Sequence, residues 1–306
     1  MPEMPEVETV RRTLRPLVVG KTIDHVDIWY DKVITGDPET FKRELKGKTF
    51  TAVDRYAKFL LFRLGDLTVV SHLRMEGKYH LTTWDAPVDK HEHLQFAFTD
   101  GSSLRYADVR KFGRLQLVET GTEFQVTGLK NLGVEANSPE FRLDYFEKGL
   151  KKRSMNIKSL LMSQTLVAGL GNIYVDEVLW QSRINPLTPA NELTKDQVKQ
   201  LHSAINETIE EATKYGGTTV HSFLNAEGGP ATTRKSSRSM ARRGSHAPAA
   251  GKTLSRSRSA GGEPPTACIV KRGKRLDDFL SGTDRRDCHG QVDRQPDIKR
   301  SGLPGH

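Results

Sequence analysis

The sequence predicts an α+β protein with several domains: an N-terminal helix and antiparallel β-sandwich, then a helical domain, then a disordered C-terminal tail. Three observations predict it. Short segments alternate apolar and polar residues over positions 22–120, and from Asp144 onward apolar residues recur at helical spacing. After Gly229 these periodic positions stop, and Ser, Arg, Gly and Pro dominate. The expected domains are 1–135, 136–229 and 230–306.

A helix is expected at the start of the chain, where apolar residues recur at helical spacing. These residues are Val7, Val10, Leu14 and Leu17. The following region contains short apolar runs with turn signals such as Gly-Asp at 65–66 and Asp-Gly at 100–101 between them. The strands expected there include 22–30, 59–64, 67–73, 94–99 and 115–118. Short strands separated in this way indicate an antiparallel sandwich or barrel.

The second domain is predicted to be helical from the period of its apolar residues. The expected helices are 144–151, 154–163, 172–182 and 194–213. The last opens at Thr194 and Asp196, residue types that cap helix N-termini. The tail, in contrast, has too few apolar residues to offset the loss of chain entropy on folding, so we expect it to be disordered.

The charge is unevenly distributed along the chain, so the net charge says little about binding partners. The formal net charge is +9, but residues 230–306 carry 17 Lys and Arg against 7 Asp and Glu, which leaves 30 basic and 31 acidic residues in 1–229. The part expected to be globular is therefore near neutral. Any nucleic-acid binding by that part must come from local basic patches, not from the overall charge.

Composition also indicates the expected compartment and restricts the possible roles of the cysteines. The sequence has neither a long apolar run nor the basic and apolar start of a signal peptide, so a cytoplasmic protein without membrane association is expected. The two cysteines, Cys268 and Cys288, cannot supply a disulfide framework or a four-cysteine metal site.

The strongest chemical signal is the N-terminal string MPEMPEVETVRR at residues 1–12. Removal of Met1 turns Pro2 into a secondary amine, and since an α-amino group has a pKa of about 8, part of it is free to form an iminium with a sugar aldehyde carbon. The string closely resembles the start of formamidopyrimidine-DNA glycosylases, bacterial base-excision repair enzymes. The resemblance implies that Pro2 is the nucleophile and that Glu3 handles protons on the opening deoxyribose. Glu6 is then a second acid that supports Glu3 or the lesion pocket.

Two further matches to this family involve cationic side chains in the expected sandwich. The string RYAKFL at 55–60 resembles the segment that carries a catalytic lysine near the phosphates, which implies that role for Lys58. In HEH at 91–93 the resemblance assigns His91 to the DNA backbone. A His-x-His pair could also indicate a metal site, but no third ligand is evident in the sequence, so phosphate binding is preferred.

The strings HLRMEG at 72–77 and YADVRKFG at 106–113 resemble the family's loops that enter the DNA base stack. Met75 would fill the space left by the flipped base, since its side chain is unbranched and polarisable. Arg110 would face the orphaned cytosine, and Phe112 would wedge between neighbouring bases.

The helical region resembles the family's helix–two-turn–helix domain. The matching strings are KKR at 151–153, IKSLL at 157–161 and QTLVAGLGNIYVDE at 164–177. Gly169 and Gly171 let backbone amides approach a phosphate at the start of the second helix. The implied DNA contacts are Lys152, Lys158 and Asn172, and the implied lesion pocket contains Glu177, Thr218 and Thr219.

The resemblance ends at about residue 229. The family's C-terminus is a four-cysteine zinc finger, and this sequence lacks those cysteines. In a neighbouring reading frame, residues 245–252 can encode EPCPRCGK and residues 263–271 can encode GTTYCLHCQ, which restores both cysteine pairs in order. We infer that one base was lost near Gly228-Gly229. Structural zinc is thus a family feature missing here, and the chemistry is expected to need no cofactor.

The resemblance implies a bifunctional DNA glycosylase and abasic-site lyase that acts as a monomer on double-stranded DNA. It would excise 8-oxoguanine and formamidopyrimidines through a Pro2 imine and nick the strand by β,δ-elimination, with activity impaired by loss of the finger. One alternative is an endonuclease VIII-like glycosylase for oxidised pyrimidines, against which Met4 argues because that branch has Gly there. Another is a catalytically inactive DNA-binding frameshift product.

Overall fold

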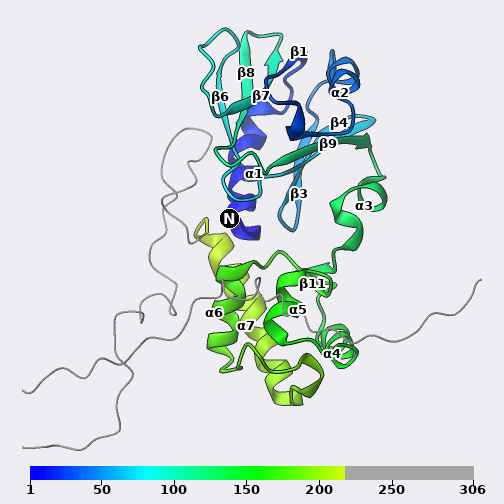
Figure 1. The fold of residues 1–306 in the computed structure, drawn as a ribbon, viewed down its shortest axis with the longest axis vertical. Coiled ribbons are helices and arrows are strands. Elements are labelled where there is room, and N and C mark those ends of the chain that lie inside the picture. Colours follow the sequence, from blue (N-terminus) through cyan, green and yellow to red (C-terminus); the bar gives the residue numbers. More distant parts are fainter. Residues whose placement is uncertain (218–306) are drawn as a thin grey trace, which may run out of the picture. The chain divides into compact units, whose positions relative to one another are not determined.

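The computed structural model describes residues 1–217, with the N-terminal helix and strands in blue and cyan and the helical region in green and yellow (Figure 1). The predicted disorder of the tail and the pocket residues Thr218 and Thr219 lie outside the described residues. In the part of the chain that the structure describes, no helix is long and apolar enough to cross a membrane.

The expected N-terminal helix is present as α1, which spans Met4–Val18. Its first turn is closed by Glu6, whose carboxylate accepts the backbone N–H of Glu3 at 3.0 Å. The apolar face of the helix, including Leu14, is buried in the core of the sandwich. Burial of this face anchors the residues just before the helix, Pro2 and Glu3, at a fixed place.

Two sheets form the sandwich that the sequence predicts. One sheet has the order β1-β7-β8-β6 and contains β1 Ile23–Ile28, β6 Lys78–Thr83, β7 Glu92–Phe98 and β8 Ser102–Ala107. The other has the order β2-β9-β5-β4-β3 and contains β2 Ile34–Thr35, β3 Ala52–Tyr56, β4 Phe59–Leu64, β5 Leu67–His72 and β9 Arg114–Glu119. Neighbouring strands are antiparallel except β2 and β9.

Aromatic side chains join the two sheets. The ring of Phe50 lies 5.7 Å from the rings of Phe62 in β4 and of Phe96 and Phe98 in β7, each in an edge-to-face arrangement. Because β4 and β7 belong to different sheets, these contacts hold the sheets face to face.

The expectation of strands throughout 22–120 is wrong at two places, the short 3-10 helix η1 Asp31–Val33 and one longer helix. Residues Pro38–Leu45 form helix α2, which is capped by Asp37: its carboxylate accepts an N–H of the first turn at 2.8 Å. The helix buries Phe41 and Leu45, four residues apart, against the sandwich. The Asp-Pro start is a helix signal that the surrounding strand pattern concealed.

The second part of the chain is helical, as predicted. Its helices are α4 Leu143–Lys151, α5 Ile157–Ser163, α6 Asn172–Gln181 and α7 Lys195–Lys214. Helix α5 begins at Ile157 and not at 154, because Asn156 caps it by accepting the N–H of Ser159 at 2.8 Å. An apolar core of its own joins these helices, and it includes Met4 from α1.

Further short elements lie within the two parts and between them. They are η1 Asp31–Val33, α3 Glu123–Val126, η2 Gly128–Asn131, η3 Ala190–Glu192, and the parallel pair β10 Val134–Glu135 and β11 Val167–Ala168. The domain boundary placed after residue 135 stays a prediction.

Candidate active site

Glu3 is held at the N-terminus of α6. Its carboxylate accepts hydrogen bonds from the backbone N–H of Gly171, from that of Ile173 at 2.9 Å and from that of Tyr174 at 3.4 Å. A Cβ on Gly171 would lie 2.5 Å from Glu3 Cδ, so this approach requires glycine. The N–H groups of a first helical turn have no partners within the helix, and they stabilise a carboxylate placed there.

Glu6 is tied to the same place. Its carboxylate accepts the backbone N–H of Glu3 at 3.0 Å and the hydroxyl of Tyr174 at 2.9 Å. Gly217 also comes close, since a Cβ there would lie 2.4 Å from Glu6 Oε1. Pro2, which precedes Glu3, is buried. Glu6 therefore fixes the backbone next to Pro2, while its predicted roles in catalysis or in the lesion pocket stay predictions.

Lys58 lies in the turn between β3 and β4 and is only 2% exposed. Burial lowers the pKa of Lys58 to about 8, although the charges of Glu3 and Glu6 oppose the shift. Burial also raises the pKa of Glu3, against the opposing effect of Lys58. Both shifts move these groups toward neutral pH, where an acid or base for sugar chemistry has to exchange protons. Glu3 and Glu6 from the N-terminal string and Lys58 from a second string thus share one buried environment.

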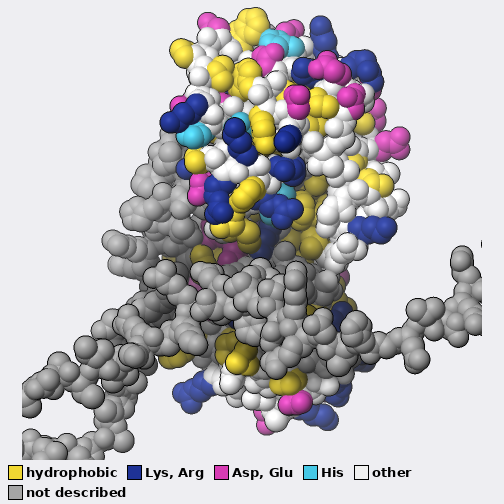
Figure 2. Space-filling model, viewed as in Figure 1, with side chains coloured by type: hydrophobic (Ala, Val, Ile, Leu, Met, Phe, Trp, Pro, Cys, Tyr) yellow, Lys and Arg dark blue, Asp and Glu magenta, His cyan; other side chains and the backbone are white. Residues whose placement is uncertain are grey.

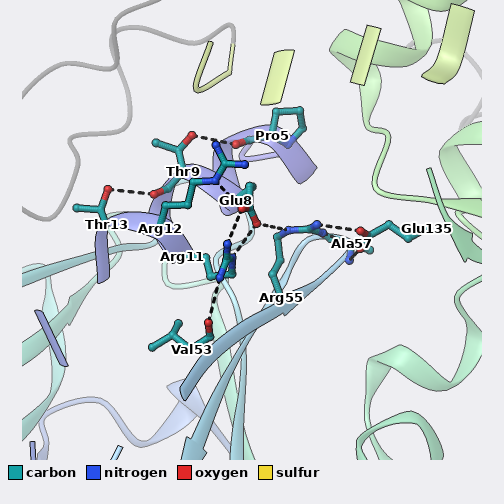
Figure 3. A network of polar contacts seen from close by, with 10 residues as sticks. All are labelled: Pro5, Glu8, Thr9, Arg11, Arg12, Thr13, Val53, Arg55, Ala57 and Glu135. Atoms are coloured by element: carbon teal, nitrogen blue, oxygen red, sulfur yellow. Dashed lines mark hydrogen bonds and ion pairs between the residues drawn. The ribbon is translucent and has the colours of Figure 1, made fainter. Parts of the chain in front are cut away.

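An ion-pair network holds the turn that precedes Lys58 (Figure 3). Arg55 donates from Nη1 and Nη2 to the carboxylate of Glu135 at 2.6 and 2.8 Å, and from Nε to Glu8 at 3.1 Å. Glu135 also accepts the backbone N–H of Ala57 at 2.5 Å, which holds that residue at a φ of 49°. We call the first pair the Arg55–Glu135 clamp. Sequence analysis missed it because the two residues are 80 positions apart and no local pattern links them.

Met75, Arg110 and Phe112 lie on two loops, 73–77 between β5 and β6 and 108–113 between β8 and β9. We call these the insertion loops. Phe112 is 49% exposed, the Arg110 guanidinium carbon lies 4.9 Å from the centre of its ring, and Met75 is partly exposed. Figure 2 shows Lys and Arg side chains interleaved with hydrophobic ones on the face of the sandwich near the start of α1. Arg110 and Phe112 lie against each other, and their roles in DNA stay predictions.

The two histidines of the His-x-His string have different surroundings. His91 is partly exposed, and its backbone N–H donates to Asp89 at 2.8 Å. His93 is buried, and its Nε2 lies 2.7 Å from the carbonyl oxygen of Asp108, to which it donates. His93 is therefore a structural residue. Among residues 1–217 no group of three or more His, Cys, Asp and Glu side chains could hold a metal ion.

Lys158 and Asn172 come together at the start of α6. Lys158 Nζ donates to Asp176 Oδ1 at 2.6 Å, and Asn172 Nδ2 donates to Asp176 Oδ2 at 3.3 Å. Asp176 thus organises two predicted phosphate contacts, a role that sequence analysis did not give it. Lys152 is exposed at the end of α4, and Glu177 is buried within α6. The proposed pocket around Glu177 stays a prediction.

A sandwich and a helical domain joined around a buried carboxylate, with an aromatic and basic loop exposed on the sandwich, are the framework of a DNA glycosylase of base-excision repair. Family models agree with this class. The formamidopyrimidine-DNA glycosylase N-terminal domain matches residues 1–115, and the formamidopyrimidine-DNA glycosylase H2TH domain matches residues 132–223. The chain belongs to the formamidopyrimidine-DNA glycosylase family.

Individual relatives support the same assignment. The formamidopyrimidine-DNA glycosylase of Lactobacillus helveticus is 62% identical over 229 residues, which cover 74% of this chain and 83% of that protein. The Bacillus licheniformis enzyme is 53% identical over 230 residues, covering 74% and 84%. A crystal structure of the Lactococcus lactis enzyme with abasic-site DNA is similar with a TM-score of 0.68 and 44% identity, covering 72% of this chain and 81% of that one.

The zinc site of the family does not fit this chain. Four thiolates are needed, and the sequence contains two cysteines, Cys268 and Cys288, which lie outside the described residues. No step of the chemistry is therefore assigned to a metal.

Proposed function

We propose that this chain, once Met1 is removed, excises 8-oxoguanine and formamidopyrimidines from double-stranded DNA and then cuts the strand. The observation that carries the proposal concerns Glu3, the residue directly after Pro2. Its carboxylate is held by three backbone N–H groups at the N-terminus of α6. A nucleophilic amine and a proton-exchanging carboxyl group on adjacent residues can act on the same sugar carbon.

In the proposed reaction the Pro2 nitrogen attacks C1′ of the damaged nucleotide and the base departs. Glu3, whose pKa is raised by burial, gives a proton to the ring oxygen as the sugar opens, which leaves an iminium between C1′ and Pro2. Loss of a C2′ proton then expels the 3′ phosphate, and loss of a C4′ proton expels the 5′ phosphate in a second elimination. We assign to Lys58, while it is protonated, the stabilisation of the departing phosphates.

The proposed DNA contacts follow from what each group can offer. Lys152, Lys158 and Asn172 on the helical domain, together with His91 on the sandwich, are assigned to phosphates. Met75, Arg110 and Phe112 are assigned to the gap left by the flipped base. One chain is proposed to act alone, without a cofactor for the chemistry.

A second candidate substrate class is oxidised pyrimidines. One crystal structure of the similar Lactococcus lactis enzyme holds DNA with an oxidised pyrimidine, and another holds a benzylated formamidopyrimidine deoxyguanosine. Excision from matched duplexes with 8-oxoguanine or 5-hydroxycytosine separates the two. We expect faster release of the purine, and a preference for the pyrimidine would favour the endonuclease VIII-like alternative.

The test of the proposed chemistry compares two versions of the chain in single-turnover excision on an 8-oxoguanine·cytosine duplex. One has Met1 removed, and the other keeps Met1 through a variant processing site. The processed chain should release the base and nick the strand, and the chain that keeps Met1 should do neither, because its Pro2 nitrogen is a tertiary amide, which is not a nucleophile. Equal activity of the two versions would refute Pro2 as nucleophile.

A further inference from the structure

Both insertion loops close over the same buried side chain, Tyr106 in β8. Tyr106 is fully buried, and its hydroxyl touches the last residue of each loop. A Cβ on Gly77 would lie 2.4 Å from Tyr106 Oη, and a Cβ on Gly113 would lie 1.6 Å from it. Each loop therefore needs glycine at its end, because the phenol occupies the space that a side chain would take.

Asp108 fixes the backbone of the second insertion loop. Its Oδ1 accepts the N–H of Arg110 at 3.0 Å, and its Oδ2 accepts the N–H of Phe112 at 2.9 Å and that of Gly113 at 2.8 Å. The Tyr106 hydroxyl donates to the same Oδ2 at 3.4 Å. Asp108 is 1% exposed, so these hydrogen bonds are shielded from water. One carboxylate thus sets the direction in which the side chains of Arg110 and Phe112 project from the loop.

The peptide groups of Asp108 are anchored as well. Its carbonyl oxygen accepts from His93 Nε2 at 2.7 Å, and its N–H donates to the carbonyl of His91 at 2.9 Å. The base of the loop is thereby attached to β7, in the interior of the sheet.

The first insertion loop is held by the last residue of β5 and by a hydrogen bond within its own backbone. His72 Nδ1 accepts the N–H of Arg74 at 2.9 Å, with Arg74 at a φ of 54°, and the N–H of Gly77 donates to the carbonyl of Leu73 at 2.9 Å. Burial, helped by the charges of Arg74 and Lys58, lowers the pKa of His72 to about 3, so its ring is neutral and free to accept. The loop that carries Met75 is therefore closed between a fixed start and the Tyr106 hydroxyl.

We propose that Tyr106 and Asp108 are positioning residues that hold the two insertion loops as one rigid unit, so that Met75, Arg110 and Phe112 enter the duplex together. The proposal rests on the proposed function, because it concerns how the base is extruded. Neither residue touches DNA in this account. When the loops are already ordered, each side chain loses less conformational entropy on binding DNA.

The experiment uses Asp108→Asn and Tyr106→Phe in the full chain with Met1 removed. Asparagine replaces an acceptor with an N–H₂ group that faces backbone donors, and phenylalanine removes only the hydroxyl between the two glycines. Excision from an 8-oxoguanine·cytosine duplex is compared with borohydride trapping on a single-stranded abasic oligonucleotide, which has no base to extrude. We expect Asp108→Asn to lower duplex excision by about 100-fold, with a much smaller loss in trapping and a milder but equally selective loss for Tyr106→Phe.

Coupling between the loops is tested by adding Met75→Ala to each background. If the loops act as one unit, Met75→Ala should lower duplex excision by a smaller factor in the Asp108→Asn background than in the wild type. The reason is that the loop that presents Met75 is already displaced in that background. Glu123→Gln is the matched control: Glu123 is also a buried turn carboxylate, which accepts the N–H of Gly121. It should lower the melting temperature and leave the ratio of excision to trapping unchanged.

Additive effects of Met75→Ala and Asp108→Asn, or equal losses in excision and trapping, would overturn the proposal. A wild-type chain that traps no abasic DNA would instead contradict the proposed Pro2 chemistry. The two failures are therefore distinguishable.

Discussion

Among single residues, Lys58 carries a large energetic cost. Its pKa of about 8, against an ordinary 10.5, shows that burial disfavours its charged form. Between these two values the unfolded chain holds a proton that the folded protein has released, so stability rises as the pH increases from about 8 to 10.5. At pH 7 both states are protonated and the folded state carries the full penalty, on the order of 3 kcal/mol.

Replacement of this lysine should therefore separate stability from activity. Lys58→Met keeps an unbranched side chain of similar length and removes the buried charge, so we expect a higher melting temperature at pH 7, a smaller gain above pH 10 and a loss of strand cleavage. Thermal unfolding across pH and a nicking assay measure these effects. Lys130→Met, at an exposed position, is the control and should change neither. A lower melting temperature at pH 7 with cleavage intact would contradict the assigned environment.

At the scale of elements, the sequence predicted features formed by residues close together along the chain, but not features that join distant residues. The helix at 4–18 and the insertion loops are encoded by short strings, and the structure has them where they were expected. Helix α2 was missed because eight residues within a run of strands gave a weaker signal than their neighbours. The hydrogen bonds from the start of α6 to Glu3 and the Arg55–Glu135 clamp join residues far apart in sequence, so only the fold brings these residues together.

The Arg55–Glu135 clamp yields a prediction about coupled energies. Glu135→Met leaves the guanidinium of Arg55 buried with only Glu8 as an acidic partner, and we expect a loss of about 3 kcal/mol in the free energy of unfolding. Arg55→Met should lower the free energy of unfolding by a similar amount, because it removes the guanidinium partner of Glu135. The double variant Arg55→Met/Glu135→Met should be more stable than the sum of the single losses implies, because it leaves no unpaired charge between these positions.

Urea unfolding of the four proteins measures this cycle. Nicking activity should fall in both single variants, because the turn with Ala57 and Lys58 loses its anchor. Strictly additive losses would show that the two side chains do not act as a pair.

At the scale of the whole molecule, the described residues form two large apolar cores, one in the sandwich and one in the helical part, and a smaller cluster around Leu61, Val70, Val118 and Leu129. Described residues make up both large cores, so we expect residues 1–217 to fold in the 306-residue chain. The inferred loss of one base near Gly228-Gly229 then bears on DNA binding more than on folding.

Insertion of one base near these codons should restore a chain that binds one zinc ion and excises 8-oxoguanine much faster than the 306-residue chain. The restored finger adds phosphate contacts, and each neutralised phosphate contributes strongly to affinity through counterion release. Metal analysis and single-turnover excision at low salt compare the two chains. A tightly held zinc ion in the 306-residue chain, or equal rates, would contradict the frameshift account.

The central claim, that the Pro2 amine forms a covalent bond to the damaged sugar, is tested most directly by locating the trapped adduct. The processed chain is incubated with an abasic-site duplex and borohydride, digested with nuclease and trypsin, and analysed by mass spectrometry. We predict that the reduced sugar is attached to the peptide Pro2–Arg11, on the proline nitrogen. A sugar attached to Lys58 or another lysine, with Pro2–Arg11 unmodified, would contradict it.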